Sequence, residues 1–358
     1  MPTPLIFDGH NDTILRLVNP KPDRPDSFFA ENAHGHIDLP RARAGGLGGG
    51  FFALFVPNQR RPETASVFPG EGLKKDGQAQ YEMQLPPMLD HGYALRYAIG
   101  MMAKLFEVEK ESDGATKIVR TADELQQCLD DGTFAMILHF EGAEAIDEDL
   151  HALYTFYNAG LRSIGPVWSR PNIFASGVPF AFPSTPDIGP GLTDAGKRLV
   201  KACNELGVML DLSHLNEKGF WDIAELSDAP LVATHSGAHA MSATPRNLTD
   251  AQLDTIAKSG GVAGVNFHIG FLREDGRADL ETSLAEIVRH VDYMVERMGV
   301  DHVALGSDFD GAIMPHDLKD AAGLPKLVEA LEDRGYTGED LTKIAHGNWV
   351  RVLRQTWK

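Results

Sequence analysis

The sequence predicts an α/β protein whose parallel strands close into a (β/α)8 barrel of the TIM type. Three observations predict this fold: apolar, strand-like runs occur eight times, helical stretches separate them, and polar side chains directly follow several of the runs. The chain has 358 residues, which is long for one ordinary domain but normal for such a barrel. We therefore expect a single barrel domain over residues 1–358.

The eight runs have the length and apolar content of buried strands. They are residues 5–8, 50–56, 134–140, 161–167, 208–212, 231–234, 262–267 and 303–306. A helical pattern covers about residues 88–110. Residues 45–50 are mostly glycine but lack the Lys-Ser/Thr pair of a phosphate loop, so we predict a turn into the second strand.

Two long loops interrupt this alternation. Residues 57–89 are polar and rich in Pro, Gly, Lys and Gln, which is typical of a lid, a partner surface or a segment without chemical role. Residues 170–192 carry five prolines together with Phe174, Phe180 and Phe182. These aromatic side chains either wall a pocket above the fourth strand or pack within their own loop.

Composition excludes several classes of protein. The chain is 43% apolar and 23% charged, as in ordinary globular proteins. Its 51 acidic against 33 basic residues give a net charge of -18, which repels nucleic acids and anionic membranes. No signal-like start and no apolar run of about 18 residues is present, so we expect a cytoplasmic location. Cys128 and Cys203 are distant in sequence and are expected to be buried thiols.

Side chains that bind metals follow several predicted strands. Because the carboxyl ends of all strands meet at one face of such a barrel, these side chains are expected to converge there. They are His10 and Asp12 after the first run, Glu141 after the third, His214 after the fifth, His235 after the sixth and Asp308 after the eighth. One histidine at a strand end is weak evidence for a site. Metal-binding side chains after five of the predicted strands, however, indicate a common site.

Imidazoles and carboxylates in this combination suit a site for two metal ions, for which zinc is our expectation. Glu141 would give one oxygen to each ion. His10 and Asp12 would hold one of the ions, and His214 and His235 the other. Two such ions lower the pKa of a water molecule between them, which then serves as a nucleophile.

An ordered set of motifs over nearly the whole chain resembles the renal, or membrane, dipeptidase family (metallopeptidase family M19), within the amidohydrolase superfamily. The motifs are Asp8-Gly9-His10-Asn11-Asp12, Glu141-Gly142, Asp211-Leu212-Ser213-His214, Thr234-His235-Ser236, Arg246-Asn247-Leu248, Asp308-Phe309-Asp310-Gly311 and Gly347-Asn348-Trp349. The resemblance implies a metal-dependent hydrolase barrel with two zinc ions on the five ligands above. It also implies cleavage of dipeptides, often with a D-residue at the C-terminal position.

The resemblance gives roles to residues outside the ligand set. Asp308 matches the family carboxylate that passes a proton to the leaving amine. Arg246 matches the arginine that receives the free carboxylate of the substrate, which a guanidinium binds through two parallel hydrogen bonds. Asp310 is expected to brace its turn, and Asn247 to cap a helix that begins near residues 249–250.

One position departs from the family pattern. Many members carry a histidine after the fourth strand that is thought to stabilise the oxyanion, and here Trp168 takes its place. An indole can donate a hydrogen bond but cannot carry a positive charge, so Trp168 is a candidate for substrate binding. His268 and Arg170 are candidates for oxyanion stabilisation, and the alternative for both is a residue that packs within its loop. His139 lies two residues before Glu141, and we expect it to pack in the barrel rather than bind metal.

These observations predict a zinc-dependent dipeptidase that acts on small dipeptides. Two alternatives stay open: another amidohydrolase activity, such as deacylation of N-acyl amino acids or opening of lactams, and a catalytically silent barrel that binds a peptide or metabolite. The sequence shows no obvious interface stripe, and a homodimer is left open.

Overall fold

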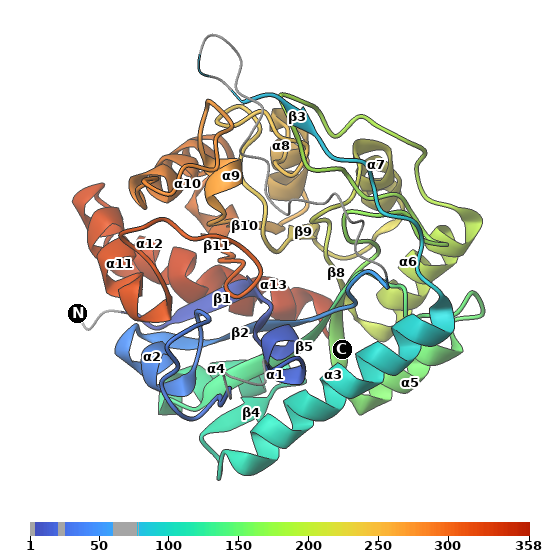
Figure 1. Ribbon diagram of the computed structural model, residues 1–358, viewed down its shortest axis with the longest axis horizontal. Coiled ribbons are helices and arrows are strands. Elements are labelled where there is room, and N and C mark those ends of the chain that lie inside the picture. The colour runs from blue at the N-terminus through green and yellow to red at the C-terminus, as the bar shows by residue number, and fades with distance from the viewer. Residues whose placement is uncertain (1–3, 21–25, 60–76, 78) are drawn as a thin grey trace.

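The computed structural model describes residues 4–20, 26–59, 77 and 79–358, and its centre is a ring of eight parallel strands with helices outside (Figure 1). The ring consists of β1 (Ile6–Asn11), β2 (Leu47–Phe55), β5 (Phe134–Glu141), β6 (Leu161–Gly165), β8 (Met209–Leu210), β9 (Val232–Ala233), β10 (Val262–Val265) and β11 (Val303–Leu305). All eight predicted strands are present, so the predicted barrel class is confirmed.

The ring closes through two short contacts between two sheets. One sheet has the order β1-β2-β5-β6-β8, and the other has the order β11-β10-β9. A parallel bridge between Asp211 and Val232 joins β8 to β9, and a second bridge, between Asn11 and Phe309, joins β1 to the segment after β11. We call these contacts the β8–β9 seam and the β11–β1 seam.

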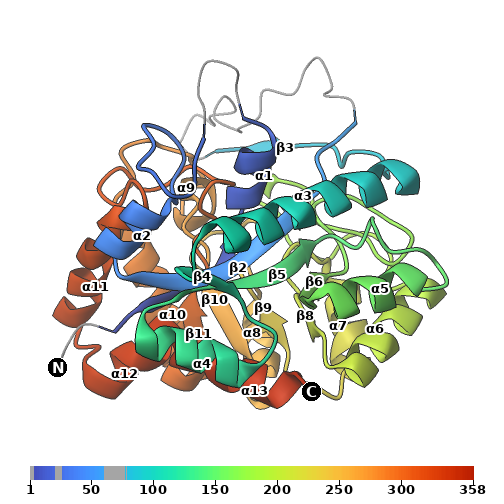
Figure 2. The ribbon, with the colours of Figure 1, turned by 90° about the horizontal axis from the view of Figure 1, so that it is seen from below.

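Thirteen α-helices lie in the described part of the chain, most of them between successive barrel strands. They are α1 (Thr13–Val18), α2 (Leu39–Ala44), α3 (His91–Glu111), α4 (Ala122–Asp131), α5 (His151–Ala159), α6 (Asp194–Leu206), α7 (Glu217–Leu226), α8 (Asp250–Lys258), α9 (Ile269–Leu272), α10 (Ala285–Met298), α11 (Leu324–Asp333), α12 (Gly338–Thr342) and α13 (Asn348–Thr356). None of them combines the length and the hydropathy that a membrane span requires. Figure 2 shows α4, α12 and α13 at one end of the molecule, and α1, α9 and β3 (Tyr81–Glu82) at the other.

Local sequence explains where these helices begin and end. The helix predicted over residues 88–110 is α3, and the Asp90 side chain caps it by accepting a hydrogen bond from Tyr93 N. Helix α6 begins after the capping residue Thr193 and ends at Gly207, which has a positive φ of 72°. Cys128 and Cys203 are free and buried, as predicted.

The two long loops meet each other at the end of the barrel that carries β3. Residues 60–76 and 78 of the first loop lie outside the described residues. In its described part, β3 pairs antiparallel with β7 (Ala181–Phe182) of the second loop. Phe174 and Phe182 are buried, whereas Phe180 is partly exposed. A third short strand, β4 (Thr116–Ile118), pairs with β5 outside the ring.

The predicted turn at residues 45–50 is only half right, because β2 already begins at Leu47. Glycines are needed inside this strand because its neighbours approach closely. A Cβ atom on Gly49 would overlap the carbonyl group of Ala135 on β5, and one on Gly50 would lie 2.9 Å from the carbonyl oxygen of Asp8 on β1. Glycine therefore marks close strand contact here rather than a turn.

The barrel interior is apolar at one end and polar at the other. Phe51, Ile137 and other buried side chains form a core with Trp349, whose indole N–H donates to the carbonyl oxygen of Leu305 at 3.2 Å. Because strand side chains alternate, His139 and then Glu141 follow Ile137 on the same face of β5. The interior thus changes from apolar to ionisable toward the carboxyl ends of the strands.

Candidate metal centre

The predicted ligands converge where the barrel strands end. His10 Nε2, at the end of β1, lies 3.6 Å from Asp12 Oδ2 and 3.6 Å from Glu141 Oε2. Asp308 belongs to the same group, because its carboxylate lies within 4.8 Å of the ligand atoms of His10 and Asp12. All of these side chains are buried or nearly so. One half of the predicted centre is therefore assembled from β1, β5 and the segment after β11.

Glu141 faces a second group of side chains with its other oxygen. Glu141 Oε1 lies 2.9 Å from His214 Nε2 and 3.6 Å from His235 Nε2. The two Nε2 atoms are 3.1 Å apart. The two carboxylate oxygens of Glu141 therefore point at different imidazoles, which is the arrangement that a bridging ligand between two cations requires.

Hydroxyl groups orient two of the histidines. Ser169 Oγ lies 2.8 Å from His214 Nδ1, and Thr234 Oγ1 lies 2.8 Å from His235 Nδ1. Thr234 Oγ1 donates its hydrogen to Asp211 Oδ2 at 2.6 Å, so it must accept from His235 Nδ1. The lone pair of His235 is then on Nε2, the nitrogen that faces Glu141. Such partners fix the tautomer that a metal needs.

Burial keeps these two histidines neutral. Burial, together with the nearby Arg246, lowers the pKa of His214 to about 4. Burial also lowers the pKa of His235 well below its ordinary value. A metal binds the neutral form of imidazole, so both rings are ready as ligands.

The carboxylates of the centre influence one another and His10. Burial, with Glu141 and Asp308 nearby, raises the pKa of Asp12 to about 7. Burial also opposes the ionisation of Glu141, yet the charge of His10 and hydrogen bonds from the histidines hold its pKa well below the ordinary value. Three acidic groups gathered around the imidazoles of His10, His214 and His235 are a donor set that fits divalent cations.

Unusual backbone conformations aim several of these side chains. His214, Asp308 and Asp310 have positive φ angles of 68°, 62° and 66°, which is rare for residues other than glycine. Asp310 braces its turn as predicted, because it accepts hydrogen bonds from Thr13 Oγ1 at 2.8 Å and from His36 N at 2.6 Å. Its carboxylate therefore holds the loop rather than the centre.

Arg246 lies beside the centre with an incomplete set of partners. It is only 3% exposed, and its Nη2 donates to the carbonyl oxygen of His235 at 3.0 Å. Its Nε is buried and has no hydrogen-bond partner among the described residues, none of which forms an ion pair with Arg246. A buried guanidinium in this state is suited to an external carboxylate.

Asn247 does not cap a helix, contrary to the prediction. Thr249 caps α8 in a reciprocal arrangement with Gln252. Asn247 instead accepts from Gly237 N at 2.9 Å and donates to the carbonyl oxygens of Ser242 and Phe271. It ties together the loop that carries Arg246.

An aromatic wall, made of Phe55, Trp168, Phe180 and Phe271, connects His214 with Arg246. The ring of Trp168 lies 5.8 Å from that of His214, 4.9 Å from Phe55 and 5.7 Å from Phe180. Phe180 stacks on Phe271 at 6.0 Å, and the Arg246 guanidinium lies 5.4 Å from the Phe271 ring. Phe180 of the second long loop thus contributes to a wall above the strands, whereas Phe174 packs into the core.

The candidates for replacing the family histidine have different surroundings. Arg170 is fully buried and donates to Glu144 Oε1 at 2.7 Å, to Asn58 Oδ1 at 2.9 Å and to the carbonyl oxygen of Val56, so the prediction that it serves the oxyanion is wrong. His268 packs edge-on against Phe271 at 4.5 Å, and its role stays a prediction.

Three supporting residues were not recognised as such in the sequence. They are Ser169, Thr234 and Asn266, which hydrogen-bond to His214, His235 and Asp308 respectively. Asn266 Nδ2 donates to Asp308 Oδ2 at 3.0 Å. Asn266 is a polar residue near the end of an otherwise apolar strand, so the rule for strand exits could have identified it.

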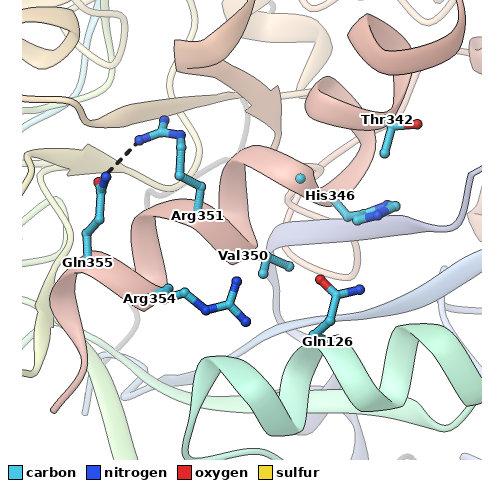
Figure 3. Close-up of a pocket in the computed structure, with 8 residues that line it drawn as sticks. Gln126, Thr342, His346, Val350, Arg351, Arg354 and Gln355 are labelled. Atoms are coloured by element: carbon cyan, nitrogen blue, oxygen red, sulfur yellow. Dashed lines mark hydrogen bonds between the residues drawn. The ribbon is translucent and has the colours of Figure 1, made fainter.

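A surface pocket of about 490 Å³ lies between α4 and α13, away from the carboxyl ends of the strands (Figure 3). Arg351 on its border donates to the carbonyl oxygens of Gly260, Gly261 and Asp301 as well as to Gln355. Its guanidinium therefore holds chain segments together, and this pocket does not share the chemistry of the metal centre.

The whole chain, residues 1–358, matches the family described as membrane dipeptidase, peptidase family M19. The chain belongs to this family. It is therefore a metallo-dipeptidase, an enzyme that hydrolyses peptide bonds, and this assignment does not agree with a catalytically silent barrel.

Several relatives of this M19 chain are similar over most of their length. A metallo peptidase from Rhodobacter sphaeroides, solved with a phosphinate mimic of the dipeptide L-Ala-D-Ala, is 48% identical with a TM-score of 0.92, over 99% of this chain and 100% of that one. An uncharacterised protein from the pqqA 5′ region of Klebsiella pneumoniae is 50% identical over 257 residues, 72% of this chain and 95% of that protein. Dipeptidase verJ of Clonostachys rogersoniana is 29% identical over 97% of this chain and 83% of its own.

Proposed function

We propose that the chain is a binuclear zinc dipeptidase that cleaves dipeptides of the L-Xaa-D-Xaa type. The observation that carries this proposal is Glu141, whose two oxygens face two separate sets of imidazoles. The Rhodobacter relative, which binds a mimic of L-Ala-D-Ala, supports the substrate class. A cytoplasmic location and a homodimer stay predictions.

In this proposal, His10 and Asp12 would hold one zinc ion, His214 and His235 would hold the other, and Glu141 would offer an oxygen to each. When bound, the ions would supply polarisation of the scissile carbonyl group and a lowered pKa of water. The protein contributes the neutral imidazoles of His214 and His235, oriented by hydroxyl groups, and carboxylates that offset the charge of the ions.

Arg246 binds the free carboxylate of the dipeptide. Its buried Nε lacks a partner within the described part of the chain, so a carboxylate satisfies a donor that folding has left without one. A longer peptide has no carboxylate at this distance from the scissile bond, which makes Arg246 a selector for dipeptides. Trp168 and the rest of the aromatic wall contact the residue between Arg246 and the scissile bond.

Asp308 moves the proton. Its Oδ2 is held by the Asn266 amide, and its backbone N–H donates to the carbonyl oxygen of His10 at 3.0 Å. The carboxylate is thereby fixed beside His10 and Asp12, where it accepts a proton from the attacking water and passes it to the leaving nitrogen.

Metal removal and substrate analogues test this function. We expect chelated protein to be inactive on L-Ala-D-Ala, and addition of two equivalents of zinc to restore turnover. Amidation of the substrate carboxylate should lower kcat/KM strongly, since Arg246 loses its ligand. An N-acetylated amino acid distinguishes a dipeptidase from the alternative, a deacylase of N-acyl amino acids. A deacylase would hydrolyse N-acetyl-D-alanine, whereas a dipeptidase requires a dipeptide.

The variant Asp308→Asn separates catalysis from metal binding. It keeps the acceptor for Asn266 but cannot take up a proton, so kcat should fall by roughly 10²- to 10⁴-fold with the zinc content unchanged. Undiminished turnover in Asp308→Asn, or zinc-loaded protein that leaves a panel of L-Xaa-D-Xaa dipeptides intact, would contradict the proposal.

A further inference from the structure

His10 differs from the other two histidine ligands in its surroundings. His214 and His235 each have a hydroxyl group at Nδ1. His10 is fully buried, and neither of its ring nitrogens has a hydrogen-bond partner among the described residues. Its Nε2 faces Asp12 and Glu141, so its Nδ1 is left as a buried polar atom that needs a partner.

Two polar side chains outside the proposed ligand set, His139 and Asp211, also lie close to His10. A ring nitrogen of His10, one of His139 and a carboxylate oxygen of Asp211 lie within 4.8 Å of one another. His139 Nε2 lies 3.5 Å from Asp211 Oδ2 and has no hydrogen-bond partner among the described residues. All three side chains are almost completely buried.

Two hydrogen-bond acceptors of this group, on His139 and Asp211, face each other without a donor from the described residues between them. His139 Nδ1 lies 2.8 Å from Ser163 Oγ, a hydroxyl group that can accept a hydrogen bond from it. We take Nδ1 as the donor, which makes Nε2 an acceptor. Nε2 then faces Asp211 Oδ2, another acceptor, and a molecule with two hydrogens between them satisfies both.

We propose that a buried water molecule bridges His10, His139 and Asp211, and that His139 is a positioning residue for the metal ligand His10. The water accepts the hydrogen of His10 Nδ1 and donates its own two hydrogens to His139 Nε2 and Asp211 Oδ2. A single oxygen at about 2.8 Å can reach three atoms spaced in this way, and three partners are typical of a buried water. The inference rests on the proposed metal centre.

A third metal ion fits this place poorly. Asp211 already accepts hydrogen bonds from Ser213 N, Thr234 N and Thr234 Oγ1. An ion here would also require His10 to lose the protons of both ring nitrogens, since its other nitrogen serves the centre above. A neutral water needs neither change.

The water fixes the tautomer and the ring orientation of His10. Outer partners of this kind typically change metal affinity by 10- to 100-fold. Removing His139 should therefore weaken the ion on His10 and Asp12, and leave the ion on His214 and His235, which have their own hydroxyl partners, unchanged.

Stepwise zinc binding to the full chain, measured by chelator competition, tests the inference without an activity assay. We expect His139→Leu to weaken one of two binding steps by 10- to 100-fold and to leave the other within threefold. His139→Gln restores a polar partner and should recover part of the loss. His290→Leu is the matched control: His290 is buried and hydrogen-bonded but contacts no ligand, so both steps should stay as in the unchanged protein.

The outcomes separate this inference from the proposed function. If the unchanged protein binds two ions and cleaves dipeptides, but His139→Leu weakens both steps equally or neither, only the inference fails. A stoichiometry of three ions also overturns it. If the unchanged protein binds no transition metal, the inference and the proposed function fail together.

Discussion

Gly311 is the position where the smallest substitution should disturb the centre most. A Cβ atom at Gly311 would overlap Asp12 Oδ2 and would lie 2.5 Å from Asp308 Oδ1, closer than real contacts allow. Gly311 itself is exposed and has no positive φ, so alanine is compatible with the backbone. The added methyl group must therefore push one or both carboxylates aside by about 1 Å.

A displacement of this size near reacting groups typically costs about 10²-fold in rate. We expect Gly311→Ala to lower kcat/KM on L-Ala-D-Ala by about that factor. The free energy of unfolding of the metal-free protein, from urea titration, should change by less than about 1 kcal/mol because the residue is exposed.

Gly100→Ala is the matched control for this substitution. A Cβ atom at Gly100, which is exposed within α3, meets no atom within 4 Å. This variant should keep full activity and gain up to about 1 kcal/mol of stability from helix propensity. If Gly311→Ala retained activity within threefold, or lost it only by unfolding, the steric reasoning would be refuted.

Three further substitutions have defined outcomes. Arg246→Lys replaces the two-pronged guanidinium group by a single ammonium group. It should lower kcat/KM for a free dipeptide by about 10- to 100-fold and change kcat/KM little for the dipeptide amide, which steady-state kinetics with both substrates would measure. Phe180→Ala opens the aromatic wall and should lower kcat/KM about tenfold for dipeptides with a bulky apolar C-terminal residue. An equal loss for dipeptides that end in glycine would contradict a contact between the wall and that side chain. Burial lowers the pKa of His290 from 6.5 to about 4, so the unfolded state binds more protons and stability falls between about pH 6.5 and 4. Urea unfolding should show that His290→Gln loses about 3 kcal/mol less over this range, and identical pH profiles would exclude His290 as the cause.

The alternation of apolar and helical runs predicted the barrel, and the strand exits predicted the convergence of His10, Glu141 and Asp308. Both follow from local periodicity combined with one topological rule, so a single sequence contains enough information. The family resemblance added the assignment of Arg246, for which the local sequence alone favours a surface residue.

The errors arose where long-range packing decides. Gly49 is read locally as a turn residue, but its place in β2 depends on the approach of Ala135, which is distant in sequence. Arg170 precedes a proline in a loop, and only the fold shows that Glu144 and the segment of Val56 and Asn58 accept hydrogen bonds from its guanidinium. The need for glycine at position 311 likewise depends on Asp12, about 300 residues earlier in the chain.

The two seams of the barrel lie beside residues of the proposed site. His214 and His235 stand on opposite sides of the β8–β9 seam, where a single bridge joins the sheets. His10 and Asp308 face each other across the β11–β1 seam in the same way. In the proposed centre, a cation bound by both His214 and His235 would link two half-barrels whose backbones meet at only a few residues. Loss of that cation would then remove the chemistry and also loosen the part of the barrel that shapes the site.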